Sequence, residues 1–436
     1  MSQTDEHEAT EAPGPHDGEP HEGGALGHRH ARSSPARAMA LLAGMAAVVV
    51  LSIVTGSFPA VAFVLALIMS VMLHEAGHFV TAKWADMKVT EFFFGFGPRL
   101  WSFRKGDTEY GAKAIPAGGY VKIVGMSNME KGIDPADEPR TYRQQSYPKR
   151  VVVAVAGIVT HFVIAFLILM LMWTVVGVPN DEKPTLTIGS ISRLESGPSP
   201  AEEAGFKVGD RIVSLDGQPV TQWEELPRQI RARPGQTMTF VVERAGRPRT
   251  ITAVPAGVNP EGEEVGFIGI GSKVELETVN PLVAVARSTE DLGRLTVGSV
   301  KALGAFFSPS SLSDYGSQLI GGSSSKEKEE GRPVSVVGVV RIADQAAETG
   351  LFEFLAILVM INIFVAVFNM VPLLPLDGGH IAIATYERIR SRKGVRYHAD
   401  VQKLLPVTAV VVMFLVILGI TSVWLDIVNP VNNPFQ

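Results

Sequence analysis

The sequence has 436 residues, 46% of them hydrophobic, with a positive mean hydropathy and a formal net charge of −5. This length predicts two or three folding units of about 150 residues each, and the hydropathy favours membrane segments. No basic stripe favours nucleic acid as a partner. The absence of cysteine excludes disulfides, thiolate metal ligands and a cysteine nucleophile.

The N-terminal residues 1–37 are rich in Glu, Gly, Pro and His and contain almost no apolar run. Such a segment buries too little apolar surface to offset the entropy of ordering, so it is predicted to be a disordered, His-rich tail. Loose metal capture by its histidines is the alternative to a merely solvated tail. A cleaved signal peptide is not expected, because the first apolar run starts late and lacks a convincing cleavage site.

Four hydrophobic blocks follow, and about 20 helical residues are enough to cross the hydrocarbon core of a bilayer. The first block is too long for one span, and TGSFP at 55–59 offers a turn within it. Five spans are therefore predicted, at 38–55, 58–82, 151–176, 352–372 and 404–425. Four spans is the alternative, if the first of them is only an interfacial segment.

Lysine and arginine are unevenly distributed among the segments between these blocks. Residues 83–150 carry twelve basic residues and 386–403 carry six, whereas 426–436 carry none. Short basic loops stay in the cytoplasm. This predicts an N-terminus inside, a C-terminus outside, and an outer position for the long segment 177–350.

Within the outer segment, residues 184–258 combine short strand patterns with glycine turns, and 237–254 predict a hairpin that turns at Ala245-Gly246. This pattern resembles the circularly permuted PDZ domains of bacterial envelope proteases. Another small β-rich domain is the alternative. In the following region, 259–350, residues 282–307 are amphipathic and are predicted to lie at the membrane surface, and residues 308–333 are predicted to be a flexible Ser- and Gly-rich linker.

The strongest chemical signal is HEAGH, which begins at His74 inside the second predicted span. His74 and His78 are four residues apart, so on a helix both imidazoles project from one face and can bind one zinc ion. Glu75 beside them can accept a proton from a water that the metal activates. A structural histidine pair facing polar partners is the alternative. Because ionisable groups at membrane depth are costly and functional by default, a metal site is favoured.

Two histidines need a third ligand, with a fourth position left open for water. The later segment NMVPLLPLDGGH supplies Asp377 just after a span that its two prolines must interrupt. Irregular backbone at membrane depth is tolerated only inside protein or around a cavity. Glu91 and His380 are rival ligands. Asp377 is favoured because a carboxylate commonly completes two histidines in hydrolases, and because it reaches a depth similar to that of His74.

HEAGH in one span and NMVPLLPLDGG in a later one together resemble the site-2 protease family of intramembrane zinc metalloproteases. The outward PDZ-like insertion resembles the bacterial branch that cleaves anti-sigma factors. This resemblance implies hydrolysis of peptide bonds within transmembrane segments, in regulated intramembrane proteolysis and stress signalling. It assigns Zn²⁺ to His74, His78 and Asp377, and acid/base catalysis to Glu75.

The resemblance also implies substrate-binding positions. Asn369 matches an asparagine that holds the substrate backbone near the scissile bond, and Pro372 belongs to the same motif. Residues 92–126, with Gly118 and Gly119, resemble the family's membrane-associated β-hairpin and Gly-rich loop. A strand edge with close backbone approach can capture an unwound substrate by strand addition. The alternatives are an ordinary interfacial hairpin and an interhelical hydrogen-bonding role for the asparagine.

One position departs from the family pattern. Where relatives tend to show AGPxxNF, this chain has AGIVTHF, which places His161 in the third predicted span. His161 can hydrogen-bond in place of the asparagine, or it can touch the site as a regulatory ligand. A hydrogen-bonded interhelical histidine is the favoured interpretation.

The predicted fold class is a polytopic α-helical membrane protein with four to five transmembrane helices, a membrane-associated β-hairpin region and an inserted extracytoplasmic α+β PDZ-like domain. The predicted units are a disordered tail (1–37), an extra N-terminal transmembrane helix (38–55), a first metalloprotease part (56–176), the PDZ-like domain (184–258), the amphipathic and linker region (259–350) and a second metalloprotease part (351–428). The predicted location is the plasma membrane, with the active site toward the cytoplasm.

Predicted partners are the lipid bilayer, single-span membrane proteins such as anti-sigma factors as substrates, and a peptide or substrate ectodomain at the PDZ-like domain. Two other function classes remain as alternatives, a membrane metal transporter and a non-catalytic membrane scaffold. Transport does not require Glu75 beside His74, and inverted repeats are not apparent in the sequence.

Overall fold

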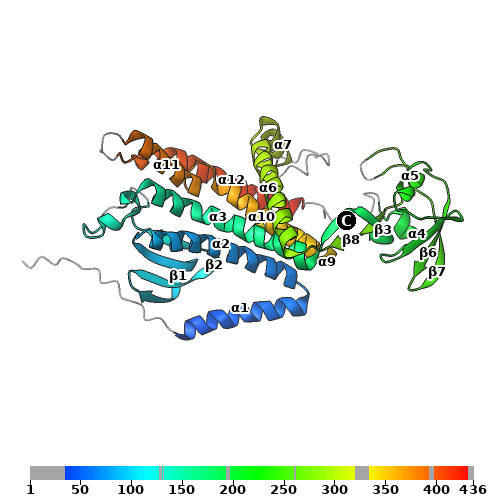
Figure 1. The fold of residues 1–436 in the computed structure, drawn as a ribbon, viewed down its shortest axis with the longest axis horizontal. Coiled ribbons are helices and arrows are strands. Elements are labelled where there is room, and N and C mark those ends of the chain that lie inside the picture. The colour runs from blue at the N-terminus through cyan, green and yellow to red at the C-terminus, as the bar shows by residue number, and fades with distance from the viewer. Residues whose placement is uncertain are drawn as a thin grey trace, which may run out of the picture.

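The computed structural model describes residues 35–126, 130, 132–192, 197–259, 262–319, 333–391 and 397–430. Most of the predicted N-terminal tail and residues 320–332 of the predicted linker lie outside the described residues. The described elements form a bundle of long helices, a β-hairpin beside one end of it, and a separate β-rich unit beyond the other end (Figure 1).

Four of the described helices are long and apolar enough to cross a membrane, by length and composition. They are α2 (Phe58–Trp84), α3 (Tyr147–Leu171) with its continuation η3 (Met172–Val176), α10 (Leu351–Asn369) and α12 (Leu405–Val428). Helix α3 packs against both α2 and α10, and apolar side chains from the three helices, Phe63 and Ile363 among them, form a common core. Helix α12 leaves most of its side chains exposed, as expected of a surface that faces lipid.

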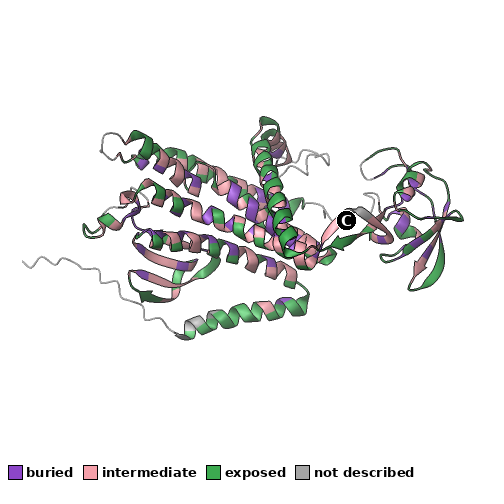
Figure 2. Ribbon diagram, in the orientation of Figure 1, coloured by how far each residue is buried: buried purple, intermediate pink, exposed green. Residues whose placement is uncertain are grey.

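Helix α1 (Pro35–Thr55) precedes α2 and contacts α2 and the β-hairpin. Most of its described side chains are exposed (Figure 2). Its apolar stretch, Leu42–Thr55, is shorter than the four full-length spans. The described helices therefore supply four full spans, the lower of the two predicted counts.

A β-hairpin follows α2, in agreement with the prediction for this part of the chain. Its strands are β1 (Val89–Lys105) and β2 (Thr108–Ile123). Both strands bend at glycines with positive φ, Gly95 in β1 and Gly118 in β2. Because of these bends, residues 91–94 pair with 109–112 on one side and with 119–122 on the other. The last stretch of β2 is therefore the strand that lies next to α2.

Two short 3₁₀-helices, η1 (Glu138–Arg140) and η2 (Tyr142–Gln144), lead from the hairpin to α3. The β-rich unit follows α3 and is called the outer unit for its place beyond the end of the helix bundle (Figure 1). Its strands are β3 (Val178–Ile191), β4 (Arg211–Leu215), β5 (Gln218–Pro219), β6 (Met238–Arg244), β7 (Arg247–Ala253) and β8 (Ile270–Glu277), and its helices are α4 (Pro200–Ala204) and α5 (Glu225–Arg231).

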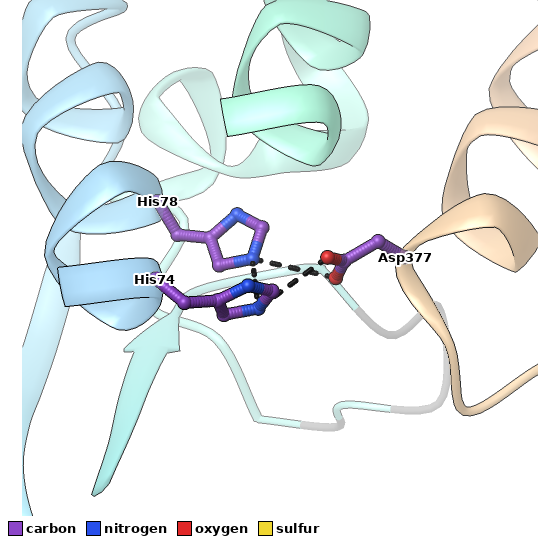
Figure 3. Close-up of side chains that lie close together, drawn as sticks. All are labelled: His74, His78 and Asp377. Atoms are coloured by element: carbon purple, nitrogen blue, oxygen red, sulfur yellow. Dashed lines mark hydrogen bonds and ion pairs between the residues drawn. The ribbon is translucent and has the colours of Figure 1, made fainter. Parts of the chain in front are cut away.

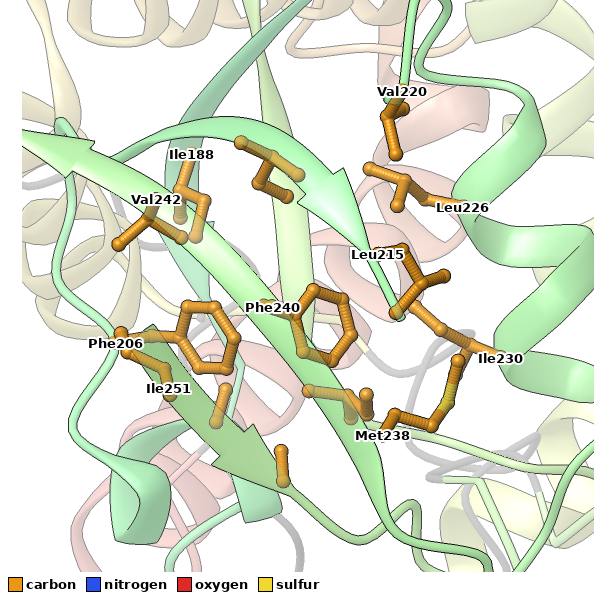
Figure 4. Packing of buried hydrophobic residues seen from close by; sticks show 14 residues of the cluster. Ile188, Phe206, Leu215, Val220, Leu226, Ile230, Met238, Phe240, Val242 and Ile251 are labelled. Carbon is orange, nitrogen blue, oxygen red and sulfur yellow. The ribbon is translucent and has the colours of Figure 1, made fainter. Parts of the chain in front are cut away.

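The strand order is β7-β6-β4-β3-β8, with β5 paired to β4. The predicted hairpin is confirmed: β6 pairs with β7, and Ala245 and Gly246 between them both have positive φ, which suits a tight two-residue turn. A cluster of apolar side chains around Phe240, Leu215 and Met238 forms the core of the unit (Figure 4). The sheet extends past the predicted limits of 184 and 258, because β3 and β8 form a long ribbon that connects the unit to the bundle.

Three further helices return the chain to the bundle: α6 (Pro281–Phe306), α7 (Pro309–Leu319) and α9 (Val336–Thr349). The sequence predicted a flexible linker where α7 lies, so this part of the prediction is wrong. The Tyr315 hydroxyl is hydrogen-bonded to Thr421 at 2.7 Å and lies 3.2 Å from the Ser422 hydroxyl of α12, which anchors α7 to the bundle. Helix α9 packs across the ends of α2 and α10, where Asp344 accepts a hydrogen bond from the backbone N–H of Ala60.

Between α10 and α12 the chain forms α11 (Asp377–Arg390) and a short 3₁₀-helix, η4 (Val401–Leu404). Helix α11 packs against α3 at the end of the bundle where the β-hairpin lies. A buried ion pair holds this contact, in which Arg150 of α3 donates to Glu387 of α11 at 2.6 Å. The beginning of α11 is thereby fixed beside α2 and α3.

Candidate active site

His74 and His78 lie one turn apart on α2, and both are buried. Their Nε2 atoms are 3.2 Å apart. Nδ1 of His78 lies 2.7 Å from the backbone oxygen of Val153 in α3. Because a carbonyl oxygen can only accept, this contact assigns the ring proton to Nδ1 and leaves the lone pair of Nε2 free.

Helix α3 approaches the histidine pair at Gly157. A Cβ atom at this position would lie 2.4 Å from Cε1 of His74 and 2.5 Å from Nε2 of His78. Only glycine leaves room for both rings. Gly77 of α2 makes the matching approach to α3, where a Cβ would lie 2.6 Å from Oγ1 of Thr160. The two helices are thus in backbone contact at the level of the histidines.

Asp377 faces the pair from the first residue of α11 (Figure 3). Its Oδ1 lies 3.3 Å from Nε2 of His78, and its Oδ2 lies 3.4 Å from Nε2 of His74. The turn that precedes Asp377 folds back closely onto the end of α10. A Cβ at Gly378 would lie 2.4 Å from the backbone oxygen of Met370, so the LDGG glycine permits the tight return that aims Asp377 at α2.

The three side chains fit a metal ion. Their ligand atoms all lie within 4.8 Å of one another, and two imidazole nitrogens with one carboxylate are a donor set that zinc takes. Oδ2 of Asp377 is buried and has no hydrogen-bond partner among the described residues. A buried carboxylate oxygen without a partner is costly, and a cation between the three ligands would satisfy it.

The two rival ligands lie elsewhere. The ring of His380 packs edge-on against Tyr142, with ring centroids 6.4 Å apart. Glu91 accepts a hydrogen bond from the Tyr120 hydroxyl within the β-hairpin. In the described part of the chain, the group of side chains that lie close enough to share one metal ion is His74, His78 and Asp377, and it includes neither rival.

Glu75 is held by the β-hairpin. Its Oε2 accepts a hydrogen bond of 3.0 Å from the backbone N–H of Val121, in the strand of β2 that lies next to α2. The carboxylate is half-buried and stands outside the three-ligand group. A carboxylate that is adjacent to a metal site but not a ligand is positioned to take and give a proton.

The predicted substrate-binding residues lie in the last stretch of β2, at the end of α10 and in the turn between α10 and α11. Gly118 and Gly119 are buried where β2 meets α2, and a Cβ at Gly119 would lie 2.3 Å from Sδ of Met72. Asn369 is half-buried at the last position of α10. Pro372 is exposed and lines a cavity of about 410 Å³ between the α10–α11 turn, α11 and α12. Their roles toward a substrate remain predictions.

Two residues of the site were missed at the level of sequence, Gly157 and Asn362. Nδ1 of His161 lies 2.9 Å from Oδ1 of Asn362, so the favoured interhelical interpretation of His161 agrees with the structure. A buried amide in the middle of an apolar helix is a functional signal that could have identified Asn362. Gly157 is the glycine that AGIVTHF shares with the family pattern, but its role depends on where α3 crosses α2, which the sequence does not give.

Comparison with known proteins places this chain among membrane peptidases. Residues 62–418 match the family model described as "Peptidase family M50". The chain is 36% identical over 402 residues to "Zinc metalloprotease Rip1" of Mycobacterium tuberculosis (strain ATCC 25618 / H37Rv), with 85% of this chain and 98% of the relative covered. It is 35% identical over 408 residues to the protein of the same name in Mycolicibacterium smegmatis, with the same two coverages.

One solved structure is similar to part of the chain, the PDZ domain of an SdrC-like protein from Listeria monocytogenes. It is 19% identical, covers 20% of this chain and 87% of that one, and has a TM-score of 0.18. A similarity at this score carries no argument about the fold of the outer unit.

Proposed function

The chain belongs to peptidase family M50, the site-2 protease family, and on this basis we propose that His74, His78 and Asp377 hold the catalytic zinc ion of an intramembrane metalloprotease, with Glu75 as its general base. The observation that carries the assignment is the convergence of two imidazole nitrogens and the buried, unpartnered carboxylate oxygen of Asp377.

His74, His78 and Asp377 would hold the zinc ion, which would supply Lewis-acid chemistry to polarise a carbonyl and lower the pKa of water. The Glu75 carboxylate takes the proton of the attacking water and later delivers it to the leaving amine. The hydrogen bond from the Val121 N–H holds this carboxylate against the last stretch of β2. The ring of His78 is oriented by its contact with the backbone oxygen of Val153.

Substrates are proposed to be single-span membrane proteins of the anti-sigma-factor type, cut within the transmembrane segment. A helix must unwind before its amides can be hydrolysed, and an unwound segment can pair with a strand edge. The strand of β2 that lies beside Glu75 is the proposed docking edge, with Gly118 and Gly119 allowing close approach. Asn369 and Pro372 are proposed to contact the same segment from the opposite side.

The proposed orientation in the plasma membrane has the β-hairpin end of the bundle, and with it the site, toward the cytoplasm. The outer unit then lies outside the membrane as a PDZ-like domain. We propose that it binds a peptide or a substrate ectodomain and admits substrates that another protease has already shortened. The ribbon of β3 and β8 supports this selecting role, because it connects the outer unit directly to the helix bundle that holds the site.

The decisive experiment compares wild type with Glu75→Gln on a tagged single-span anti-sigma-factor-like substrate in membranes, with the zinc content measured in the same preparations. Loss of cleavage with zinc retained is the expected result. Glu91→Gln is the matched control and should cleave normally. Equal cleavage by Glu75→Gln would refute the base assignment.

Metal-dependent transport that survives this substitution would favour a transporter, and cellular function that survives loss of the zinc ligands would favour a scaffold.

The size-selection role of the outer unit has its own test. Asn180 of β3 faces Glu275 of β8, so residues 181–274 can be replaced by an Asn-Gly turn that closes the ribbon as a short hairpin. The shortened protein should cleave untrimmed substrate that wild type rejects. Unchanged selectivity with retained activity would remove this role.

A further inference from the structure

His161 is buried on α3, one helical turn after Gly157, with 3% of its surface exposed. Its ring lies beside that of His74, with centroids 5.0 Å apart and planes inclined by 45°. On its other side, Nδ1 lies 2.9 Å from Oδ1 of Asn362 in α10. His161 therefore stands between a metal-ligand candidate and a buried amide.

The hydrogen bonds of Asn362 decide which nitrogen of His161 carries the proton. Nδ2 of Asn362 donates to the backbone oxygen of Leu358 at 2.8 Å, so its Oδ1 is the side-chain atom left to accept. Nδ1 of His161 is then the donor to Oδ1. In the neutral ring this leaves Nε2 of His161 with a free lone pair.

His74 needs such an acceptor. Its Nε2 faces Asp377, so its Nδ1 carries the proton when Nε2 binds zinc. A metal-bound histidine almost always donates its other ring N–H to an acceptor, as His78 does to Val153. Nδ1 of His74 is buried beside the backbone of Gly157, which is the alternative acceptor, and makes no hydrogen bond of normal length and angle within the described part of the chain.

We propose that His161 is a positioning residue for the zinc site, and that its Nε2 accepts a hydrogen bond from Nδ1 of His74. A continuous chain of donors then runs from His74 through His161 and Asn362 to the backbone of Leu358. It fixes the plane of the His74 ring and makes its Nε2 a stronger ligand. This inference rests on the proposed function, in which His74 binds zinc.

Substitutions at His161 can separate its two hydrogen bonds. The amide of Gln reaches about as far as Nε2 of His, whereas the amide of Asn reaches only as far as Nδ1. His161→Gln therefore keeps an acceptor near His74, and His161→Asn keeps only the group that faces Asn362. His161→Leu keeps neither. Loss of such a supporting hydrogen bond typically weakens metal binding by about 10–100-fold.

The experiment measures zinc affinity by competition with a chelator, and the absorption spectrum after Co²⁺ substitution, in full-length protein purified in detergent. Comparison of wild type with His74→Ala shows whether the site binds metal at all. If wild type binds no metal, the proposed function fails, whatever the role of His161. The thermal midpoint of each apo-protein identifies variants that lose their fold. A further variant, Asn362→Leu, leaves His161 in place but removes the acceptor that fixes its tautomer.

The expected result is weakening of zinc affinity by about 10–100-fold in His161→Asn and His161→Leu, near-normal affinity in His161→Gln, and a smaller loss in Asn362→Leu. The Co²⁺ spectrum should change in the same order. Affinity equal to wild type in all variants would overturn the proposal, and the Gly157 backbone would then be the acceptor. Equal losses in His161→Gln and His161→Leu would also overturn it, because packing of the ring, and not an acceptor, would be the cause.

Discussion

Both carboxylate oxygens of Asp377 face the histidine pair, and Oδ1 lies 3.3 Å from Nε2 of His78. The two residues come from opposite ends of the chain, with the whole outer unit between them. Their contact depends on α3, which packs against α2 through Gly157 and against α11 through the ion pair of Arg150 and Glu387. The site can therefore be disturbed at its ligands or at either of these helix contacts.

Replacing the acidic ligand should remove the metal. Asp377→Ala leaves two histidines, which bind zinc too weakly to retain it, so zinc content and cleavage are both expected to be lost. His380→Ala, three residues later on the same helix, is the matched control and should retain zinc, because its ring packs on Tyr142. Metal analysis of the purified proteins checks both. Zinc loss in His380→Ala with zinc retained in Asp377→Ala would reverse the ligand assignment.

A methyl group at Gly157 should disrupt the site without touching a ligand. In Gly157→Ala the new Cβ would overlap both histidine rings, so the rings or the helices must move. We expect a destabilisation of about 1–3 kcal/mol and a clear loss of zinc affinity. Gly419→Ala in α12 is the control, since nothing lies within 4 Å of its Cβ position. Thermal unfolding and zinc competition measure the two effects, and normal zinc binding by Gly157→Ala would contradict the observed helix approach.

The buried ion pair between α3 and α11 should be sensitive to loss of one partner. Arg150 and Glu387 are both almost fully buried, and the Glu387 carboxylate also accepts from the backbone N–H of Ala399. Glu387→Gln leaves a buried guanidinium uncompensated, which is expected to cost about 3–5 kcal/mol.

The exposed pair of Arg211 and Glu243 supplies the comparison for this substitution. Glu243→Gln should cost no more than about 1 kcal/mol. Thermal unfolding in detergent distinguishes the two variants. Similar small losses in both would show that the α3–α11 contact does not depend on the charge pair.

The outer unit should lose stability in acid through Asp210. Burial alone would raise the pKa of this carboxyl, but hydrogen bonds from Arg244 and from the backbone of Lys207 outweigh it and hold the pKa below the ordinary value. Since the folded-state pKa is the lower one, the stabilisation is complete above the unfolded value of about 3.9 and is lost as pH falls through the folded value.

Asp210→Asn should remove this stabilisation at neutral pH, at a cost of about 2–3 kcal/mol, and should flatten the acid dependence. Hydrogen exchange of the β4 and β6 strands in the full-length protein, measured from pH 7 down to about pH 3 for both proteins, is the readout. An unchanged acid profile in Asp210→Asn would assign the acid sensitivity to other groups.

Local patterns predicted the parts of this structure that depend on near neighbours in sequence. The spacing of His74 and His78 placed both imidazoles on one face of α2, and the Ala245-Gly246 turn predicted the β6–β7 hairpin. The long apolar runs predicted the spans. These predictions follow from helix periodicity, turn chemistry and the length of apolar runs, which are all local in sequence.

Contacts between distant segments were harder to predict. Asp377, and not His380, faces the histidines because of the way the α10–α11 turn folds. The contact of Glu75 with Val121 depends on which strand of the hairpin lies next to α2. The polar composition of α7 resembled a linker, and the contact of its Tyr315 hydroxyl with Thr421 of α12 joins segments that are far apart in sequence. Gly157 and Asn362 acquire their roles only where α3 meets its neighbours.

The division of the metal site between α2 and α11 also bears on how the protein is made. During synthesis the ribosome produces His74, Glu75 and His78 early, and the acidic ligand follows only after the outer unit and α10 have been completed. On the proposed assignment, a partly synthesised chain therefore has Glu75, His74 and His78 but lacks the third ligand of the metal site. On this assignment, we expect the chain to be unable to cleave neighbouring membrane proteins until its last helices have been inserted and have packed.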